Sequence, residues 1–142
     1  MLRPLIGALA LAALPVSGEA HALFPGTQTV QTATDRAFAR FQAVNGRRDV
    51  TDFVVEVFDM DWRPSRIAVA SPSRLRVPYH EADDTQSGDK PFSVLISLDG
   101  QREQRLRVCT RSVPPASAAK AAVVTRVNTR VCATVTVRKF GT

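Results

Sequence analysis

The pattern that decides the fold lies in the last strand-like segment, which reads Arg126-Val127-Asn128-Thr129-Arg130-Val131-Cys132-Ala133-Thr134-Val135-Thr136-Val137-Arg138. Its even positions are polar or Cys, and its odd positions are apolar or small. A period of two is typical of a β-strand with one solvent-facing and one buried face. The segment Arg105–Arg111 repeats the alternation and also carries its Cys on the arginine-bearing face. The two segments therefore predict two strands whose cysteines face the same way.

Cys109 and Cys132 are predicted to form a cross-strand disulfide, the usual fate of paired cysteines in an oxidising compartment. The alternatives are a redox pair and a metal site. The C-x-x-C spacing of a redox pair is absent, and a metal site needs further ligands nearby. If the two cysteines lie opposite each other in an antiparallel pair, Arg111 faces Arg130 across the ladder.

Two like charges directly opposite each other are unfavourable, unless an anion or a carboxylate bridges them. The sequence therefore suggests a face that binds an anion or an acidic partner. An ordinary solvated face is the alternative, because charges at strand spacing are common on wet surfaces. The predicted anion- or partner-binding residues are Arg105, Arg107, Arg111, Arg130 and Arg138.

The N-terminus has the features of an export signal. Met1-Leu2-Arg3 is a short positive start, Leu5–Leu14 is an apolar run, and Ala20-His21-Ala22 is an A-x-A cleavage site. The run is shorter than the roughly 20 residues needed to span a bilayer, although a retained N-terminal anchor is the alternative. Residues 1–22 are therefore predicted to be a cleaved signal peptide, and 23–142 a single periplasmic or secreted domain.

The chain carries a net charge of +6. Loss of the leader removes one base and one acid, so this charge is kept by the mature chain. A basic exported protein suits a protein partner, such as a fibre subunit, or an anionic envelope component. Nucleic acid is not among the expected partners. Solubility alone is the simpler explanation of the charge.

Short β-favouring segments separated by turn residues run along the mature chain. They predict an all-β fold: a single immunoglobulin-like β-sandwich of about seven to eight antiparallel strands. The predicted strands are Thr27–Thr32, Arg36–Val44, Asp52–Phe58, Ile67–Ala70, Leu75–Val77, Phe92–Leu98, Gln104–Val113 and the final segment.

One of these segments, Arg36–Val44, also has apolar residues at helical spacing. The Asn45-Gly46 turn signal and the β-rich segment after it favour a strand with a hairpin-like connection. Asp99-Gly100 likewise predicts a tight hairpin turn between two strands.

Signals of catalysis are weak. His80 is the one histidine of the predicted mature chain, and it lies in a polar loop with Glu81, Asp83 and Asp84. These residues could bind a cation or transfer protons, but a polar loop needs no chemistry to explain them. We expect no enzyme, no cofactor and no metal site. Trp62 is expected to pack in the core or at an edge rather than to bind a ligand.

Several segments resemble the N-terminal immunoglobulin-like domain of periplasmic pilus chaperones, the PapD-like family. They are Phe41–Asn45, the run Phe53–Phe58, the passage Ile67–Leu75 with its Ser71-Pro72-Ser73, and the closing pair Phe92–Leu98 and Leu106–Val113. The resemblance covers roughly Thr27 to Val113. It implies a sandwich that holds pilus subunits by lending a strand, with a positive pair gripping the subunit's C-terminal carboxylate.

Two features depart from that family. The chain is too short for the family's second domain, and the stretch Leu23–Thr34 has neither the Arg nor any Lys for the carboxylate grip. Arg74 and Arg107 are the candidate substitutes. We therefore expect a non-enzymatic, chaperone-like protein-binding module of the kind used in pilus assembly. Its predicted open edge is at Leu106 and Val108, or along Val131–Val137.

Overall fold

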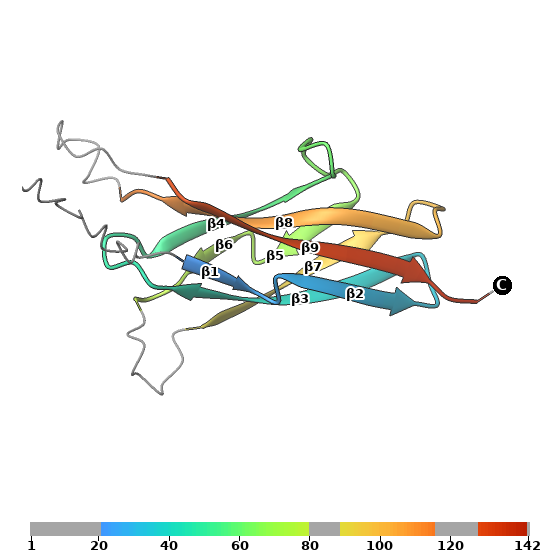
Figure 1. Ribbon diagram of the computed structural model, residues 1–142, viewed down its shortest axis with the longest axis horizontal. Coiled ribbons are helices and arrows are strands. Elements are labelled where there is room, and N and C mark those ends of the chain that lie inside the picture. The colour runs from blue at the N-terminus through green and yellow to red at the C-terminus, as the bar shows by residue number, and fades with distance from the viewer. Residues whose placement is uncertain (1–20, 80–88, 116–127, 142) are drawn as a thin grey trace, which may run out of the picture.

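The computed structural model describes residues 21–79, 89–115 and 128–141 (Figure 1). The described chain forms nine strands and no helix. They are β1 (His21–Phe24), β2 (Thr27–Thr32), β3 (Arg36–Asn45), β4 (Asp52–Phe58), β5 (Ala68–Ser71), β6 (Arg74–Arg76), β7 (Lys90–Ser97), β8 (Glu103–Val113) and β9 (Arg130–Lys139).

The strands form two sheets that pack face to face as a sandwich. The four-stranded sheet has the order β1-β3-β7-β5, and the five-stranded sheet has the order β2-β9-β8-β4-β6. The all-β immunoglobulin-like sandwich predicted from the sequence is confirmed. Two details differ: β1 is a strand that was not expected, and β2 pairs with β9 in parallel rather than antiparallel.

Strand β3 settles the ambiguous segment in favour of a strand. Its residues alternate between exposed and buried along its length, and it pairs with β1 on one side and β7 on the other. The apolar residues at helical spacing therefore divide between two faces. Phe41 is 2% exposed and lies in the core, whereas Phe38 is 64% exposed on the outer face.

The core is built from the inward-facing residues of both sheets. Small residues of β3 and β9 and branched residues of β7 and β8 fill the space between the layers. Burial of these side chains is the main favourable contribution to folding. The largest fully buried apolar residues are Phe41, Phe53, Ile96, Leu98, Val77, Val94, Val108, Val135 and Val137.

Neither of the two predicted hairpin turns joins paired strands. Asn45-Gly46 leads from β3 in the four-stranded sheet to β4 in the five-stranded sheet. Asp99-Gly100 leads from β7 to β8, again between sheets, with φ of 50° and 74° and a hydrogen bond from Gln101 N to Leu98 O. The hairpin predictions are wrong because local turn chemistry fixes a reversal and not the sheet that receives the next strand.

Asn45 is the structural anchor of the first of these crossings. Its side chain is fully buried, and its Nδ2 donates to Val50 O at 2.6 Å and to Val77 O at 3.0 Å. Its Oδ1 accepts from Arg47 N at 2.9 Å. A buried amide needs such partners, so this Asn fixes the path of the crossing.

The N-terminal strand also changes sheets. After β1, the chain turns at Pro25-Gly26 and continues as β2 along β9 of the other sheet (Figure 1).

Within the described residues no helix is long and apolar enough to cross a membrane. The His80 loop, Glu81, Asp83, Asp84 and most of the predicted leader lie outside the described residues.

Candidate functional site

The cross-strand disulfide predicted from the sequence is present. Cys109 of β8 lies opposite Cys132 of β9, with their Cα atoms 4.0 Å apart. The predicted register is also confirmed, because Arg111 pairs with Arg130 and Arg107 with Thr134. The arginine-bearing faces of β8 and β9 therefore form one outer surface of the five-stranded sheet.

Glu56 of β4 bridges the two facing arginines. Arg111 Nε lies 3.2 Å from Glu56 Oε1, and Arg130 Nη2 lies 3.1 Å from Glu56 Oε2. From the sequence, this like-charge pair suggested binding of an external anion or carboxylate partner; in the structure the bridging carboxylate comes from the chain itself. Glu56 was missed because it lies on β4, whose register against β8 was not predicted; the structure pairs it with Cys109.

The other three arginines have different surroundings. The Arg107 guanidinium lies 4.5 Å from the centre of the Trp62 ring, which is a cation–π contact. Arg138 forms an ion pair with Glu103, with Nε and Oε2 2.6 Å apart. Arg105 is exposed. Anion binding by this face stays a prediction, and four of its five cations are engaged within the fold.

Trp62 packs at the edge of this face, as expected. It is 49% exposed, with its ring centre 5.8 Å from that of Phe58. The turn that holds it is capped by Asp59, whose Oδ1 accepts from the backbone N–H groups of Asp61 and Arg63 at 2.9 Å each. Trp62 has a positive φ of 64°, which is uncommon for a bulky residue.

Arg74 and Arg107, the candidate substitutes for the carboxylate grip, are not neighbours in the sheet. Arg74 pairs with Val54 of β4, and Arg107 pairs with Phe58 of the same strand. Four residues along a strand correspond to about 13 Å. The backbones of the two residues therefore lie in separate parts of the face.

The prediction of an open edge at Leu106 and Val108 is wrong. Both residues lie in β8, which is a central strand between β4 and β9. Their side chains are 2% and 0% exposed and point into the core. The alternation of apolar and polar residues shows only that one face of the strand is buried. A central strand of an antiparallel sheet has the same alternation as an edge strand, so the pattern does not distinguish the two.

An open edge lies instead on the first half of β9, in addition to the outermost strands β1, β5, β2 and β6 of the two sheets. Strand β2 pairs with Thr134–Lys139 and stops there, so no described strand covers the outer edge of Arg130–Ala133. Thr134 N donates to Gly26 O at 3.0 Å, at the point where this cover begins. The second sequence alternative, an edge along Val131–Val137, lies on this strand, but β2 covers its second half, Thr134–Val137.

The backbone groups that face this edge follow from the hydrogen-bond pattern. Ser112 N donates to Thr129 O, so the odd residues of β9 bond to β8 and the even residues point away. The N–H and C=O groups of Arg130 and Cys132 therefore point toward the uncovered edge. These are the groups that an added strand would bond.

His21 of β1 lies beside this end of β9. Its Nδ1 is 3.0 Å from Thr129 Oγ1, and its Nε2 is 3.0 Å from Thr110 O. Burial lowers the pKa of His21; the hydrogen bond to the Thr110 backbone opposes this, and the nearby Arg47 charge adds to it. The ring is 3% exposed. β1 is itself an edge strand of the four-stranded sheet. Its edge and the uncovered edge of Arg130–Ala133 therefore lie close together near His21.

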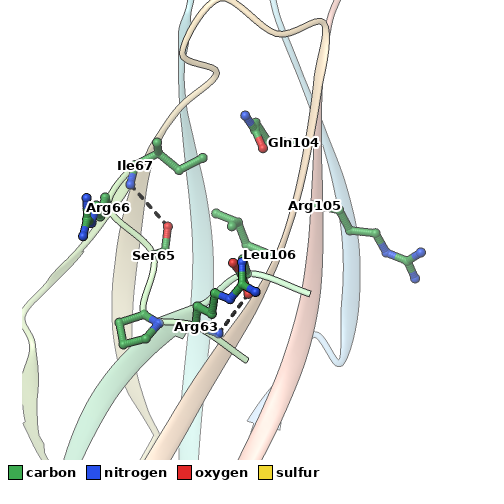
Figure 2. A pocket seen from close by; sticks show the side chains of 9 residues that line it. Arg63, Ser65, Arg66, Ile67, Gln104, Arg105 and Leu106 are labelled. Carbon is green, nitrogen blue, oxygen red and sulfur yellow. Dashed lines mark hydrogen bonds between the residues drawn. The ribbon is translucent and has the colours of Figure 1, made fainter. Parts of the chain in front are cut away.

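A separate surface pocket lies between the β4–β5 connection and β8 (Figure 2). Its volume is about 540 Å³. Figure 2 shows Ile67 and Leu106 at its apolar side, with Ser65 Oγ accepting from Ile67 N at 3.3 Å. Arg105 points away from the other labelled side chains. The pocket is thus lined by both apolar and basic residues and has no cluster of catalytic groups.

Residues 21–79, 89–115 and 128–141 contain no group of three or more His, Cys, Asp or Glu side chains that could hold a metal ion.

No protein-family model and no curated protein matches the sequence. Known structures do match the fold. The DraB chaperone of E. coli superposes with a TM-score of 0.63 at 14% identity, covering 84% of this chain and 55% of DraB.

Two further structures extend the comparison. The Salmonella enterica complex of the SafA pilin with the SafB chaperone matches with a TM-score of 0.63 at 15% identity, over 84% of this chain and 54% of the matched chain. The PapD-like domain 7 of human CEP192 matches with a TM-score of 0.54 at 9% identity, covering 100% of this chain and 99% of the matched chain. The chain therefore has the PapD-like immunoglobulin fold. It spans about half the length of the matched pilus-chaperone chains.

Proposed function

We propose that this chain is an exported, non-enzymatic module that binds an extended segment of another protein as an added strand along Arg130–Ala133 of β9. The observation that carries the proposal is the uncovered outer edge of this half-strand. The N–H and C=O groups of Arg130 and Cys132 face that edge, and backbone hydrogen bonds of this kind give strand addition its affinity.

The fold comparison supports the same class of function. The matched structures include the chaperone DraB and a chaperone, SafB, in complex with a pilin. The disulfide of the five-stranded sheet is typical of an oxidising, extracytoplasmic compartment. A fibre subunit is therefore the first kind of partner to examine.

The matched experiment uses two substitutions at one residue. Arg130→Ala removes the side chain and its contact with Glu56 but keeps the backbone N–H. Arg130→Pro removes the side chain and also the outward N–H, and it places a ring on the edge. Because that N–H has no described strand partner, proline removes no hydrogen bond of the described sheet at this position.

The mature chain and both variants are used to capture partners from envelope extract at low and high salt, and binding of the captured protein is then titrated. We expect Arg130→Ala to bind much like the parent and Arg130→Pro to bind at least about tenfold more weakly, a loss of about 1.4 kcal/mol. Equal binding by all three would overturn strand addition here. An equal loss in both variants would point to the arginine side chain instead.

A further inference from the structure

His21 is built into the fold, although the A-x-A pattern predicts its loss with the leader. Its ring is 3% exposed, with Nδ1 3.0 Å from Thr129 Oγ1 and Nε2 3.0 Å and 3.1 Å from Thr110 O and Oγ1. The ring also lies 4.8 Å from the Phe53 ring, centre to centre. A buried imidazole with partners on both nitrogens satisfies the requirement for buried polar groups.

The backbone of the same residues belongs to β1. His21 pairs with Asn45, and Ala22 pairs with Val44. A cut after Ala22 would leave only Leu23 and Phe24 of the four-residue strand. It would also leave a cavity against Phe53 and remove the partner of buried groups on Thr110, and both changes are destabilising.

We propose that the leader is removed by hydrolysis of the Ala20–His21 bond, so that His21 becomes the first residue of the mature domain. Small residues at the first and third positions before a bond define a leader cleavage site. Ala20 and Gly18 meet this requirement, as Ala22 and Ala20 do for the later bond. A leader peptidase adds water across the amide, which leaves a carboxylate on Ala20 and an α-amino group on His21.

Processing at this bond keeps the whole of β1 and the contacts that join it to β8 and to Thr129. It also keeps the residue that holds the start of β9 in place beside the open edge. The inference rests on the burial of His21 and on the leader pattern, and it is independent of what the edge binds.

The first test is the mass of the exported product. The full chain with its leader is expressed in a Gram-negative host, recovered from the periplasm and analysed by intact mass and N-terminal sequencing. We expect a chain that begins His21-Ala22-Leu23. A product that begins at Leu23, or a chain that keeps its leader, would overturn the proposal.

Two leader variants distinguish cleavage at Ala20–His21 from cleavage at Ala22–Leu23, whether or not the product is stable. Gly18→Phe places a bulky residue three positions before the proposed bond but five before the later one, so it should abolish the product that begins at His21. Ala22→Phe lies beyond the proposed bond and should leave processing intact. The reverse result, with Ala22→Phe blocked and Gly18→Phe processed, would assign the cut to Ala22–Leu23. The readout is the N-terminus of the product, which does not require native folding.

Discussion

The two halves of β9 have the same alternating sequence but different surroundings. Thr134–Lys139 lies between β8 and β2, whereas Arg130–Ala133 has β8 on one side and no described strand on the other. The open half carries the disulfide to β8 and the Glu56 bridge. The covered half carries the most deeply buried valines of β9, Val135 and Val137.

This difference arises far away in the sequence, at Pro25-Gly26. There the N-terminal strand leaves the four-stranded sheet and joins β9, and it reaches only as far back as Thr134. The length of β2 thus sets how much of β9 stays open. Local alternation cannot encode this, because a covered and an uncovered strand edge share the same side-chain pattern.

The largest effect is expected from the disulfide, which joins the open half to β8. Replacing both Cys109 and Cys132 with Ala should lower the free energy of unfolding by about 3 kcal/mol, because the bridge restricts the unfolded chain across a separation of 23 residues. Urea unfolding of the oxidised parent and the double variant measures this loss.

Reduction of the parent supplies the control for that substitution. Parent protein with reductant should unfold like the double variant, and reductant should leave the double variant unchanged. If the two losses disagree strongly, packing of the alanines rather than the cross-link explains the change. Amide exchange should rise more over Arg130–Ala133 than over Thr134–Lys139.

A pair of valine truncations compares core packing in the two halves. Val135→Ala, in the covered half, removes methyl groups from a fully buried site and should cost about 2 kcal/mol. Val131→Ala, in the open half, removes a half-buried side chain and should cost less than half as much. Equal losses in chemical unfolding would show that the open half is packed as tightly as the covered one.

The sequence predicted the features that depend on neighbours along the chain. Period-two alternation identified nearly every strand, and the facing cysteines fixed the register of β8 against β9, including Arg111 opposite Arg130. It failed where distant segments decide the outcome. The Asn45-Gly46 and Asp99-Gly100 turns cross between sheets, and Leu106 and Val108 lie on a central strand.

The candidate site shows the same limit. The open edge was assigned mainly to the wrong strand because strand order is a tertiary property. Glu56 was missed because its approach to Arg130 depends on the β4–β8 register. His21 was assigned to the leader by its A-x-A context, and the sequence His-Ala-Leu-Phe has no polar and apolar alternation that would have marked β1; the burial of His21 and Leu23 is seen only in the structure.

The Glu56 bridge allows a test, with a smaller expected effect, of the difference between the two halves of β9. Glu56→Gln keeps the side-chain size but leaves Arg111 facing Arg130 without a carboxylate. Because these side chains are 25% to 42% exposed, the expected loss of stability is only about 0.5–1 kcal/mol at low salt, and less at high salt.

Glu103→Gln is the matched control on the covered half. Its partner Arg138 is 60% exposed, so solvent screens the pair and the expected loss is close to zero. Urea unfolding at two salt concentrations measures both variants. A loss at Glu103 as large as that at Glu56, or a loss that does not respond to salt, would contradict this account.

The smallest effect concerns pH at the point where β1 meets the start of β9. Burial holds the pKa of His21 below its usual value of 6.5, so the unfolded chain takes up a proton at a higher pH than the folded chain does. Stability should therefore be complete above pH 6.5 and should fall as the pH drops from there to the folded pKa, where the loss levels off.

Unfolding titrations of the parent and a His21→Gln variant between neutral and mildly acid pH measure this dependence. The variant should lose most of the slope, because the parent's loss comes from this ring. If both proteins lose the same stability on acidification, His21 is not the group responsible. Because a chain that begins at Leu23 has no His21, the same slope in exported protein would also show that β1 enters the mature domain whole.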